Sequence, residues 1–294
     1  MPDVKASRIR CRQIAPSDIG AVIDLLTRGF PERGRPYWET GLERQGARRL
    51  PPGYPTYGYL LESDGAPVGV VLLLFASCEA DGRVTTRCNL SSWYVEPAFR
   101  GHASLLISIA LKHKAVTYFN ISPAKHTWST VEAQGFKRYA GGQFLSLAAL
   151  GPAVPGAKLS EIAPDTPAKT RSAIPDGELL AAHAGYGCIS LVCTAPDGSY
   201  PFVFLVFRPR SGLLRLPCAQ LVYCRNVKDF VRFAGPLGRF LLRRGALLVT
   251  LDANGPIYGL AGFYRESRGP KYYKGPNAPR LGDLAFTELV LFGP

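Results

Sequence analysis

The hydrophobic positions of the first half of the chain follow two different periods. Residues 8–13 are typical of a short strand, whereas apolar residues between positions 19 and 30 recur every three or four residues, as on one face of a helix. The Asp64-Gly65 pair joins two apolar runs in the manner of a β-hairpin. Continued along the chain, the pattern predicts a strand, two helices, three strands, a helix, a strand, a helix and a strand. The expected positions are 8–13, 19–30, 35–48, 57–62, 68–78, 87–95, 103–114, 115–121, 127–134 and a last strand after Gly135-Phe136.

Three landmarks of this half recur in the same order in the second half. They are an Asp-Gly turn before an apolar run, a strand that ends in tyrosine, and a Gly-Phe pair. Their offsets are nearly constant, which predicts a duplicated unit. The pairs are Gly65 and Gly198, Tyr94 and Tyr223, and Gly135 and Gly262, at offsets of 133, 129 and 127 residues (198 − 65, 223 − 94 and 262 − 135).

A stretch rich in proline, glycine and alanine, residues 151–170, shows neither period and is predicted to be a linker. It divides the chain into an expected domain at 1–150 and a degenerate copy at 171–294. In the copy, Pro236 is expected to interrupt the helix, because proline lacks the N–H and clashes with the preceding turn. The fold class predicted from these elements is α/β, with a mixed central sheet flanked by helices.

Composition narrows the class of protein. Of 294 residues, 47% are hydrophobic and 19% are charged, so the chain can bury a core and is not disordered. The apolar run 68–77 is too short to span a bilayer, and residues 1–16 lack the apolar core of a secretory signal. Seven cysteines and four histidines form no ligand-like cluster. We therefore expect a cytoplasmic protein without a metal site.

The formal net charge is +13 and the pI is about 9.6. Such a charge favours anionic partners, among them phosphorylated cofactors, acidic carrier proteins and nucleic acid. The basic residues are spread along the whole chain and form no tract with interleaved aromatic residues. Nucleic-acid binding therefore has no support other than the charge, and we do not expect it. A well-solvated basic surface explains the charge equally well.

One stretch carries the candidate chemistry, residues 90–106, with the sequence LSSWYVEPAFRGHASLL. A predicted strand ends at Val95, and a short connection leads into a helix. The N terminus of a helix leaves main-chain N–H groups unpaired and carries a partial positive charge. Small residues at that point let a phosphate come close, so the stretch predicts an anion site. The residues that suit an anion are Arg100, Gly101, Ala103 and Ser104.

The same stretch resembles the acyl-CoA-binding motif of the GNAT (GCN5-related N-acetyltransferase) superfamily. The similarity lies in Val-x-Pro-x-x-Arg-Gly, here Val95 to Gly101, followed by small residues and a leucine-rich helix. The downstream Gly135-Phe136 and the order of the predicted elements also match. The resemblance covers about residues 8–146 and extends weakly to the rest of the chain as a tandem pair. It implies a GNAT-like fold, duplicated.

The resemblance also implies the positions of the cofactor contacts. In the family, main-chain N–H groups of the turn hold the CoA pyrophosphate, and the preceding strand splays from the next one to admit the pantetheine arm. Carried over, the main chain of Val95 binds the pantetheine or thioester end. Asn120 ends the strand at which the sheet opens. The residues that line the pyrophosphate are Arg100, Gly101, His102, Ala103 and Ser104.

The chain departs from the family pattern at three positions. The family has glycine where this chain has Ala103, and glycine or alanine where it has Leu105, which crowds the phosphates unless it turns toward the sheet. A tyrosine that often acts as the general acid is replaced by Val131. Substitutes that could protonate the leaving thiolate are Tyr94, Ser92 and Tyr139.

The implied activity is an acyl-CoA-dependent N-acyltransferase, most simply an N-acetyltransferase. A small-molecule or peptide amine attacks the thioester of acetyl-CoA or another acyl-CoA directly. Two alternatives stay open: a non-catalytic CoA-binding or regulatory module, and an acyltransferase that uses acyl carrier protein, which a basic surface suits. In the second half, Arg225 to Asp229 replace the cradle without any glycine, and no second cofactor site is expected there. The sequence does not define the acceptor, the acyl length or the oligomeric state.

Overall fold

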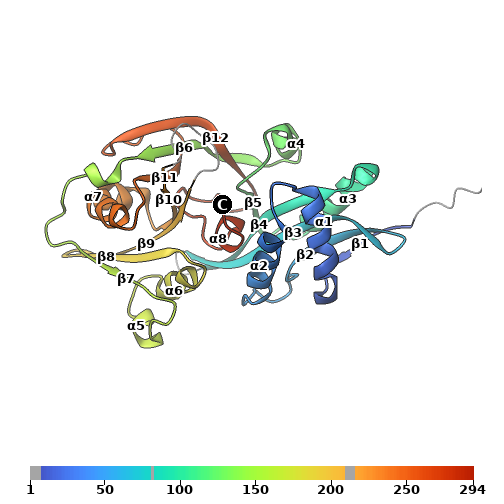
Figure 1. Cartoon of the computed structure of the whole chain (residues 1–294), viewed down its shortest axis with the longest axis horizontal. Helices are drawn as coiled ribbons and strands as arrows, with labels where there is room; N and C mark the ends of the chain where they lie inside the picture. The colour runs from blue at the N-terminus through green and yellow to red at the C-terminus, as the bar shows by residue number, and fades with distance from the viewer. Residues whose placement is uncertain (1–7, 81–82, 209–215) are drawn as a thin grey trace, which may run out of the picture. The chain divides into compact units, whose positions relative to one another are not determined.

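A computed structural model of the chain describes residues 8–80, 83–208 and 216–294 (Figure 1). Its elements repeat in one order, a strand, two helices, three strands, a helix and two further strands, first over β1 to β6 and again over β7 to β12. In the first half an additional helix, α4, lies between the last two strands. This repeat matches the three sequence landmarks. The chain divides into two compact units.

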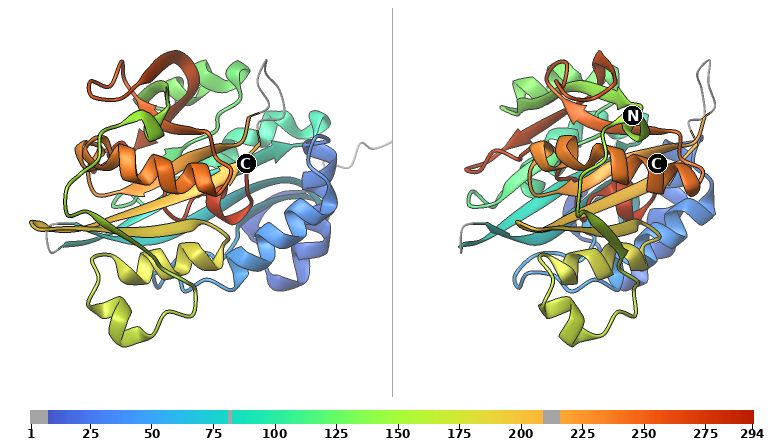
Figure 2. Two further views of the ribbon diagram at one scale, coloured as in Figure 1. Left: turned by 60° about the vertical axis from the view of Figure 1, so that its left-hand side comes forward. Right: turned by 90° about the vertical axis from the view of Figure 1, so that its left-hand side faces the viewer.

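The first unit comprises Met1–Ser122, Tyr273–Ala278 and Thr287–Gly293. Strands β1 to β4 pair antiparallel in sequence order, and β5 pairs parallel to β4. Helices α1 and α2 lie on one face of these strands and α3 on the other (Figure 2). Because both faces are covered, the middle of β3 is a continuous buried run, Val70–Phe75. The bounds are β1 Ile9–Gln13, α1 Ile19–Gly29, α2 Arg35–Gly46, β2 Gly58–Ser63, β3 Ala66–Ala80, β4 Arg83–Val95, α3 Ala103–Ala110, β5 Thr117–Asn120 and α8 Glu288–Leu291, with 3-10 helices at Pro16–Asp18 and Pro97–His102.

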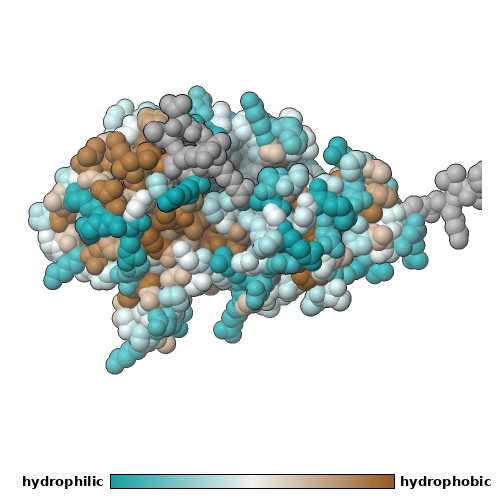
Figure 3. All heavy atoms as spheres, viewed as in Figure 1, coloured by the Kyte–Doolittle hydropathy of each residue, from teal (hydrophilic) through white to brown (hydrophobic). Residues whose placement is uncertain are grey.

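The second unit comprises Pro123–Tyr272, Pro279–Phe286 and Pro294. Its strands lie in the order β12-β6-β11-β10-β9-β8-β7. Helices α5 and α6 lie on one face and α7 on the other (Figure 2). On the face drawn in Figure 3, apolar residues gather over α7 and the strands near it. The bounds are α4 Trp128–Ala133, β6 Lys137–Ser146, β7 Lys158–Glu161, α5 Ala168–Ser172, α6 Gly177–Gly185, β8 Ile189–Ala195, β9 Gly198–Phe207, β10 Cys218–Cys224, α7 Val227–Arg243, β11 Leu248–Ala253 and β12 Gly262–Lys274, with 3-10 helices at Lys125–Thr127 and Ala148–Leu150.

The compact units do not follow the division predicted at residue 150. In the second unit, β6 from the first half of the sequence pairs antiparallel with β11, with Ser146 opposite Val249. In the first unit, the last residues of β12, from the second half, lie beside β5. The last strand of each half therefore lies beside the fifth strand of the other half: β6 beside β11, and β12 beside β5. Alternation along a strand reveals that a strand exists but not its partner, which is why sequence reasoning missed this exchange.

Two expectations about the second half are wrong. The predicted linker contains strand β7, which pairs with β8; its four residues are mostly exposed and too few to show a period. Helix α7 continues through Pro236. Burial of its apolar face outweighs the lost hydrogen bond, since Phe233, Leu237 and Leu241 are fully buried.

Glycines in α7 add to this packing. A Cβ on Gly235 or Gly238 would collide with the main chain at residues 148–152, so both glycines allow that segment to approach closely. Arg239 then donates to the carbonyl oxygens of Ala149 and Gly151, at 3.2 and 2.9 Å. In the part of the chain that the structure describes, no helix has both the length and the apolar character needed to cross a membrane.

Candidate functional site

Strands β4 and β5 separate partway along β4. They pair in parallel at only three positions, the last being Asn89 opposite Phe119. Strand β5 ends at Asn120, whereas β4 continues to Val95. We call residues 90–95 of β4, together with the end of β5, the β4–β5 splay. The predicted contacts Val95 and Asn120 lie on its two sides.

The splay contains an irregular residue on β4. Ser92 has a φ of +52°, a left-handed conformation that non-glycine residues adopt at a cost of roughly 1–3 kcal/mol. The pairing of β4 with β3 shifts there, so a β-bulge re-aims the side chains that follow. The hydroxyl of Ser92 lies 3.0 Å from the hydroxyl of Ser91, which is buried.

A buried amide occupies the point of separation. Asn89 is fully buried, and its Nδ2 donates to the carbonyl oxygens of Leu90 at 2.9 Å and Phe119 at 3.2 Å. Its Oδ1 accepts from the main-chain N–H of Glu288, at 2.8 Å, where helix α8 begins. The Glu288 carboxylate in turn accepts from the hydroxyl of Ser122, just beyond β5. Asn89 was absent from our sequence predictions.

The predicted anion cradle is an unbroken helical segment rather than an open turn. A 3-10 helix over Pro97–His102 runs directly into α3, and the Ala103 N–H donates to the Arg100 carbonyl. The main-chain donor expected at Ala103 is thus already in use. A Cβ added to Gly101 would meet nothing within 4 Å, so the protein itself does not require glycine there.

The side chains around Gly101 are open to solvent. Arg100, His102 and Ser104 are exposed, while Ala103 is half-buried. Leu105 is 46% exposed, so it does not turn toward the sheet. The side-chain donors of Arg100 and Ser104 and the open surface at Gly101 remain available to a phosphate. The exposed side chain of Leu105 follows directly after Ser104.

The three candidate catalytic residues differ in their surroundings. Ser92 lies in the splay. The ring of Tyr94 packs on α1, so closely that a Cβ on Gly29 would lie 2.5 Å from its Cγ. Tyr139 lies on β6 in the second unit. Val131, at the family's tyrosine position, also belongs to the second unit, where it is buried on α4. Ser92 and Tyr94 lie on β4 in the first unit, on the same strand as Val95, a predicted cofactor contact.

The second unit contains a matching separation of β10 and β11. These strands also pair in parallel at three positions, the last being Gln220 opposite Thr250. The offset from Asn89 to Gln220 and from Phe119 to Thr250 is 131 residues in both cases. Gln220 is buried and donates to the carbonyl of Leu221 at 3.2 Å, as Asn89 does to Leu90. We call residues 221–224 of β10, together with the end of β11 that no longer pairs with β10, the β10–β11 splay.

This second splay is filled by the chain itself. Residues 282–284 run antiparallel to the free edge of β10. The Cys224 N–H donates to the Gly282 carbonyl at 2.9 Å, and the Leu284 N–H donates to the Val222 carbonyl at 2.7 Å. We call residues 282–284 the filling segment. Asn226 is the N-cap of α7, because its Oδ1 accepts from the Lys228 N–H at 2.9 Å.

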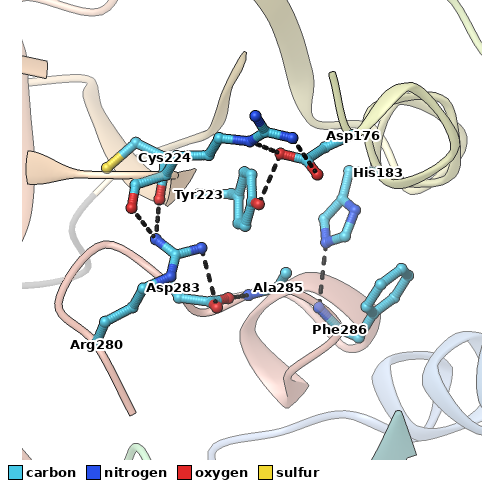
Figure 4. Close-up of polar contacts among 9 residues, drawn as sticks. Asp176, His183, Tyr223, Cys224, Arg280, Asp283, Ala285 and Phe286 are labelled. Carbon is cyan, nitrogen blue, oxygen red and sulfur yellow. Dashed lines mark hydrogen bonds and ion pairs between the residues drawn. The ribbon is translucent and has the colours of Figure 1, made fainter. Parts of the chain in front are cut away.

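A polar network holds the filling segment in place (Figure 4). Arg280 donates to the carbonyl oxygens of Cys224 and Arg225 and pairs with Asp283 at 3.2 Å. The Tyr223 hydroxyl donates to Asp176 at 2.8 Å. Burial, and then the charge of Asp176, raise the pKa of Tyr223 above its ordinary value. These side chains satisfy one another's hydrogen-bonding groups, which indicates a structural role.

The sequence carried weak signals for the features that were missed. Asn89 and Gln220 are side-chain amides on matching strands, 131 residues apart, a pattern that a repeat alignment could have exposed. The filling segment has no such signal, because its residues match neither strand nor helix period. Among the described residues, no cluster of histidine, cysteine and acidic side chains could hold a metal ion.

No protein-family model and no curated protein matches the chain in sequence. Solved structures do match it in three dimensions. A GCN5-related N-acetyltransferase from Anabaena variabilis superposes with a TM-score of 0.59 at 12% identity, covering 90% of this chain and 72% of that one. A conserved Enterococcus faecalis protein described as a probable N-acyltransferase gives 0.57 at 10%, covering 95% and 74%. Eis1 from Mycobacterium abscessus gives 0.52 at 12%, covering 94% and 74%. At these identities the matches establish the fold, and the chain has the fold of the GCN5-related N-acetyltransferases.

Proposed function

We propose that the chain is an acyl-CoA-dependent N-acyltransferase, most simply an N-acetyltransferase, whose substrate site is the β4–β5 splay. The observation that carries the proposal is the separation of β4 from β5 beyond Asn89 on a fold of this class. The pantetheine arm occupies the splay. The phosphates lie against Arg100, Gly101 and Ser104, which are exposed.

The filled splay of the second unit supports this placement. There, an extended main chain bonds to the Cys224 N–H and the Val222 carbonyl. By the offset of 129 that relates Tyr94 to Tyr223, the matching groups in the first unit are the Val95 N–H and the Trp93 carbonyl. Pantetheine carries two amides, so it offers the same kinds of acceptor and donor as the filling segment.

The chemistry needs no covalent enzyme intermediate. The acceptor ammonium loses a proton to solvent, and the neutral nitrogen attacks the thioester carbonyl carbon. The C–N bond forms, the C–S bond breaks, the nitrogen releases its second proton to solvent, and the CoA thiolate takes up a proton. Holding both substrates in one geometry supplies much of the rate enhancement. Of the candidates for the proton donor, we favour Ser92, which is half-buried at the bulge of the splay, whereas the ring of Tyr94 packs on α1.

Calorimetric titration with acetyl-CoA and with CoA tests the binding step. We expect one saturable site per chain, because the second splay is filled. Absence of saturable heat at tens of micromolar protein would count against the proposal. Acyl transfer is then assayed across a panel of small amines and peptides, with Ser92→Gly as the variant that removes the hydroxyl and keeps the left-handed conformation.

A second candidate function is a CoA-binding module without transfer activity. The observation that favours it is Val131, a buried apolar residue where the family often has a catalytic tyrosine. Saturable CoA binding with no acylated product from any amine would select this function. Stronger turnover with acyl carrier protein than with acyl-CoA would instead identify the carrier as the donor.

A further inference from the structure

The separation of β4 from β5 leaves main-chain groups in need of partners. In a parallel pair alternate carbonyls of each strand accept from the neighbouring strand, and where the strands part these carbonyls lose that partner. A buried carbonyl without a hydrogen bond destabilises the fold. The carbonyls of Leu90 and Phe119 stand at this point, one on each strand, and both accept from the Asn89 amide.

Asn89 is itself held from the far end of the sequence. Its Oδ1 accepts from the N–H of Glu288, the first residue of α8. Helix α8 is fixed to α2 in the same unit: Arg44 donates to the Leu291 carbonyl at 3.2 Å, and the ring of Phe292 lies 6.0 Å from Trp38. The orientation of the amide is therefore set by residues about 200 positions away.

We propose that Asn89, oriented by the Glu288 N–H, is the positioning residue that keeps the β4–β5 splay in the geometry that accepts the pantetheine arm. Residues 287–293 are then a functional part of the acyl-CoA site. This inference rests on the proposed function. It goes beyond it by assigning a role to a residue and a helix that make no predicted contact with the phosphates.

The test separates the arm from the phosphates with two probes. CoA carries both, whereas adenosine 3′-phosphate 5′-diphosphate lacks the arm. The variant Asn89→Asp keeps the Oδ1 acceptor and removes the amide donor, and Asn89→Ala removes both. We expect both to weaken CoA binding by roughly tenfold and to change binding of the second probe by less than about twofold. Circular dichroism and thermal melting confirm that each variant is folded.

Two variants at Glu288 test the other end of the contact. Glu288→Pro removes the main-chain N–H at the first position of a helix, where proline is favourable, and Thr287 before it is already extended. Glu288→Ala keeps the N–H and removes only the carboxylate. We expect Glu288→Pro to weaken CoA binding by about fivefold and Glu288→Ala to change it by less than about twofold.

The matched control is Gln220→Glu in the second splay, which removes the corresponding donor to Leu221. It should lower the melting temperature and leave CoA binding unchanged. Equal weakening of both probes by the Asn89 variants, or no effect on CoA, would overturn the inference. If the unaltered protein binds neither probe, the proposed function itself fails, and this inference with it.

Discussion

The two splays share a construction and differ in what occupies them. Each begins after three parallel pairs, and each has a buried amide at the third pair, Asn89 in one and Gln220 in the other. In the second unit, residues 282–284 hydrogen-bond to the free edge of β10. In the first unit, β5 ends and β4 runs on. Strand topology therefore creates the separation in both units, and in the second unit a later segment of the chain fills it.

The two amides also differ in their second contact. The Gln220 side chain accepts from the Thr250 hydroxyl at 2.8 Å, a bond between two side chains. Asn89 instead donates to the Phe119 main chain and accepts from Glu288. The carboxyl-terminal part of the chain thus serves both splays: residues 282–284 fill one, and the N–H of Glu288 orients the amide of the other. This predicts that matched substitutions at the two splays separate stability from binding.

The largest effect is expected at the filled splay. Gly282 has a φ of +76°, and a Cβ there would lie 2.7 Å from the Cys224 sulfur. Gly282→Ala should lower the free energy of unfolding by about 2–4 kcal/mol, because a strained conformation and a collision combine. Differential scanning calorimetry measures the loss, and the affinity of the folded protein for CoA should not change. A variant with unaltered melting and weaker CoA binding would mean that the second splay takes part in ligand binding.

The same substitution at Gly101, in the 3-10 helix before α3, should act in the opposite way. A Cβ on Gly101 meets nothing within 4 Å, so Gly101→Ala should leave the melting temperature unchanged or slightly higher. If phosphates occupy that space, the methyl group weakens CoA binding by roughly tenfold, or about 1.4 kcal/mol. Calorimetric titration at fixed salt measures it. An unchanged affinity for CoA would show that the phosphates do not bind next to Gly101.

A smaller effect is expected at Arg100, which is exposed in the segment before α3. Arg100→Gln should weaken CoA binding about fivefold, or roughly 1 kcal/mol, because a charge-assisted contact in solvent is partly screened. The difference between the two proteins should shrink as salt is raised, and the melting temperature should not move. Lys112→Gln, at an exposed residue just beyond the end of α3, is the control for a general loss of positive charge.

The sequence predicted the elements better than their partners. Apolar periodicity located α1, the β2–β3 hairpin and β4, since each has a buried face with a regular spacing. It did not reveal the exchange of β6 and β12, because pairing is decided by tertiary contacts far apart in the chain. The same holds for Asn89: a lone amide in a strand has meaning only once its partners, Phe119 and Glu288, are known. The sequence also did not reveal that the Ala103 N–H is bonded within the chain, because the 3-10 helix after Glu96 was not predicted.

The smallest effect concerns pH and the filled splay. The pKa of Tyr223 is raised, first by burial and then by the nearby Asp176 carboxylate, whereas the unfolded chain titrates its tyrosines near their ordinary value of about 10. Above that pH the unfolded state has released the proton and the folded state still holds it, so stability falls as pH rises. The stability of the unaltered protein relative to Tyr223→Phe should therefore decline by about 0.8 kcal/mol on going from neutral pH to pH 10.5. Urea unfolding of both proteins at pH 8, 9.5 and 10.5 measures the difference. A constant difference across that range would show that Tyr223 titrates in the folded protein as it does in the unfolded chain, and that the filled splay admits water.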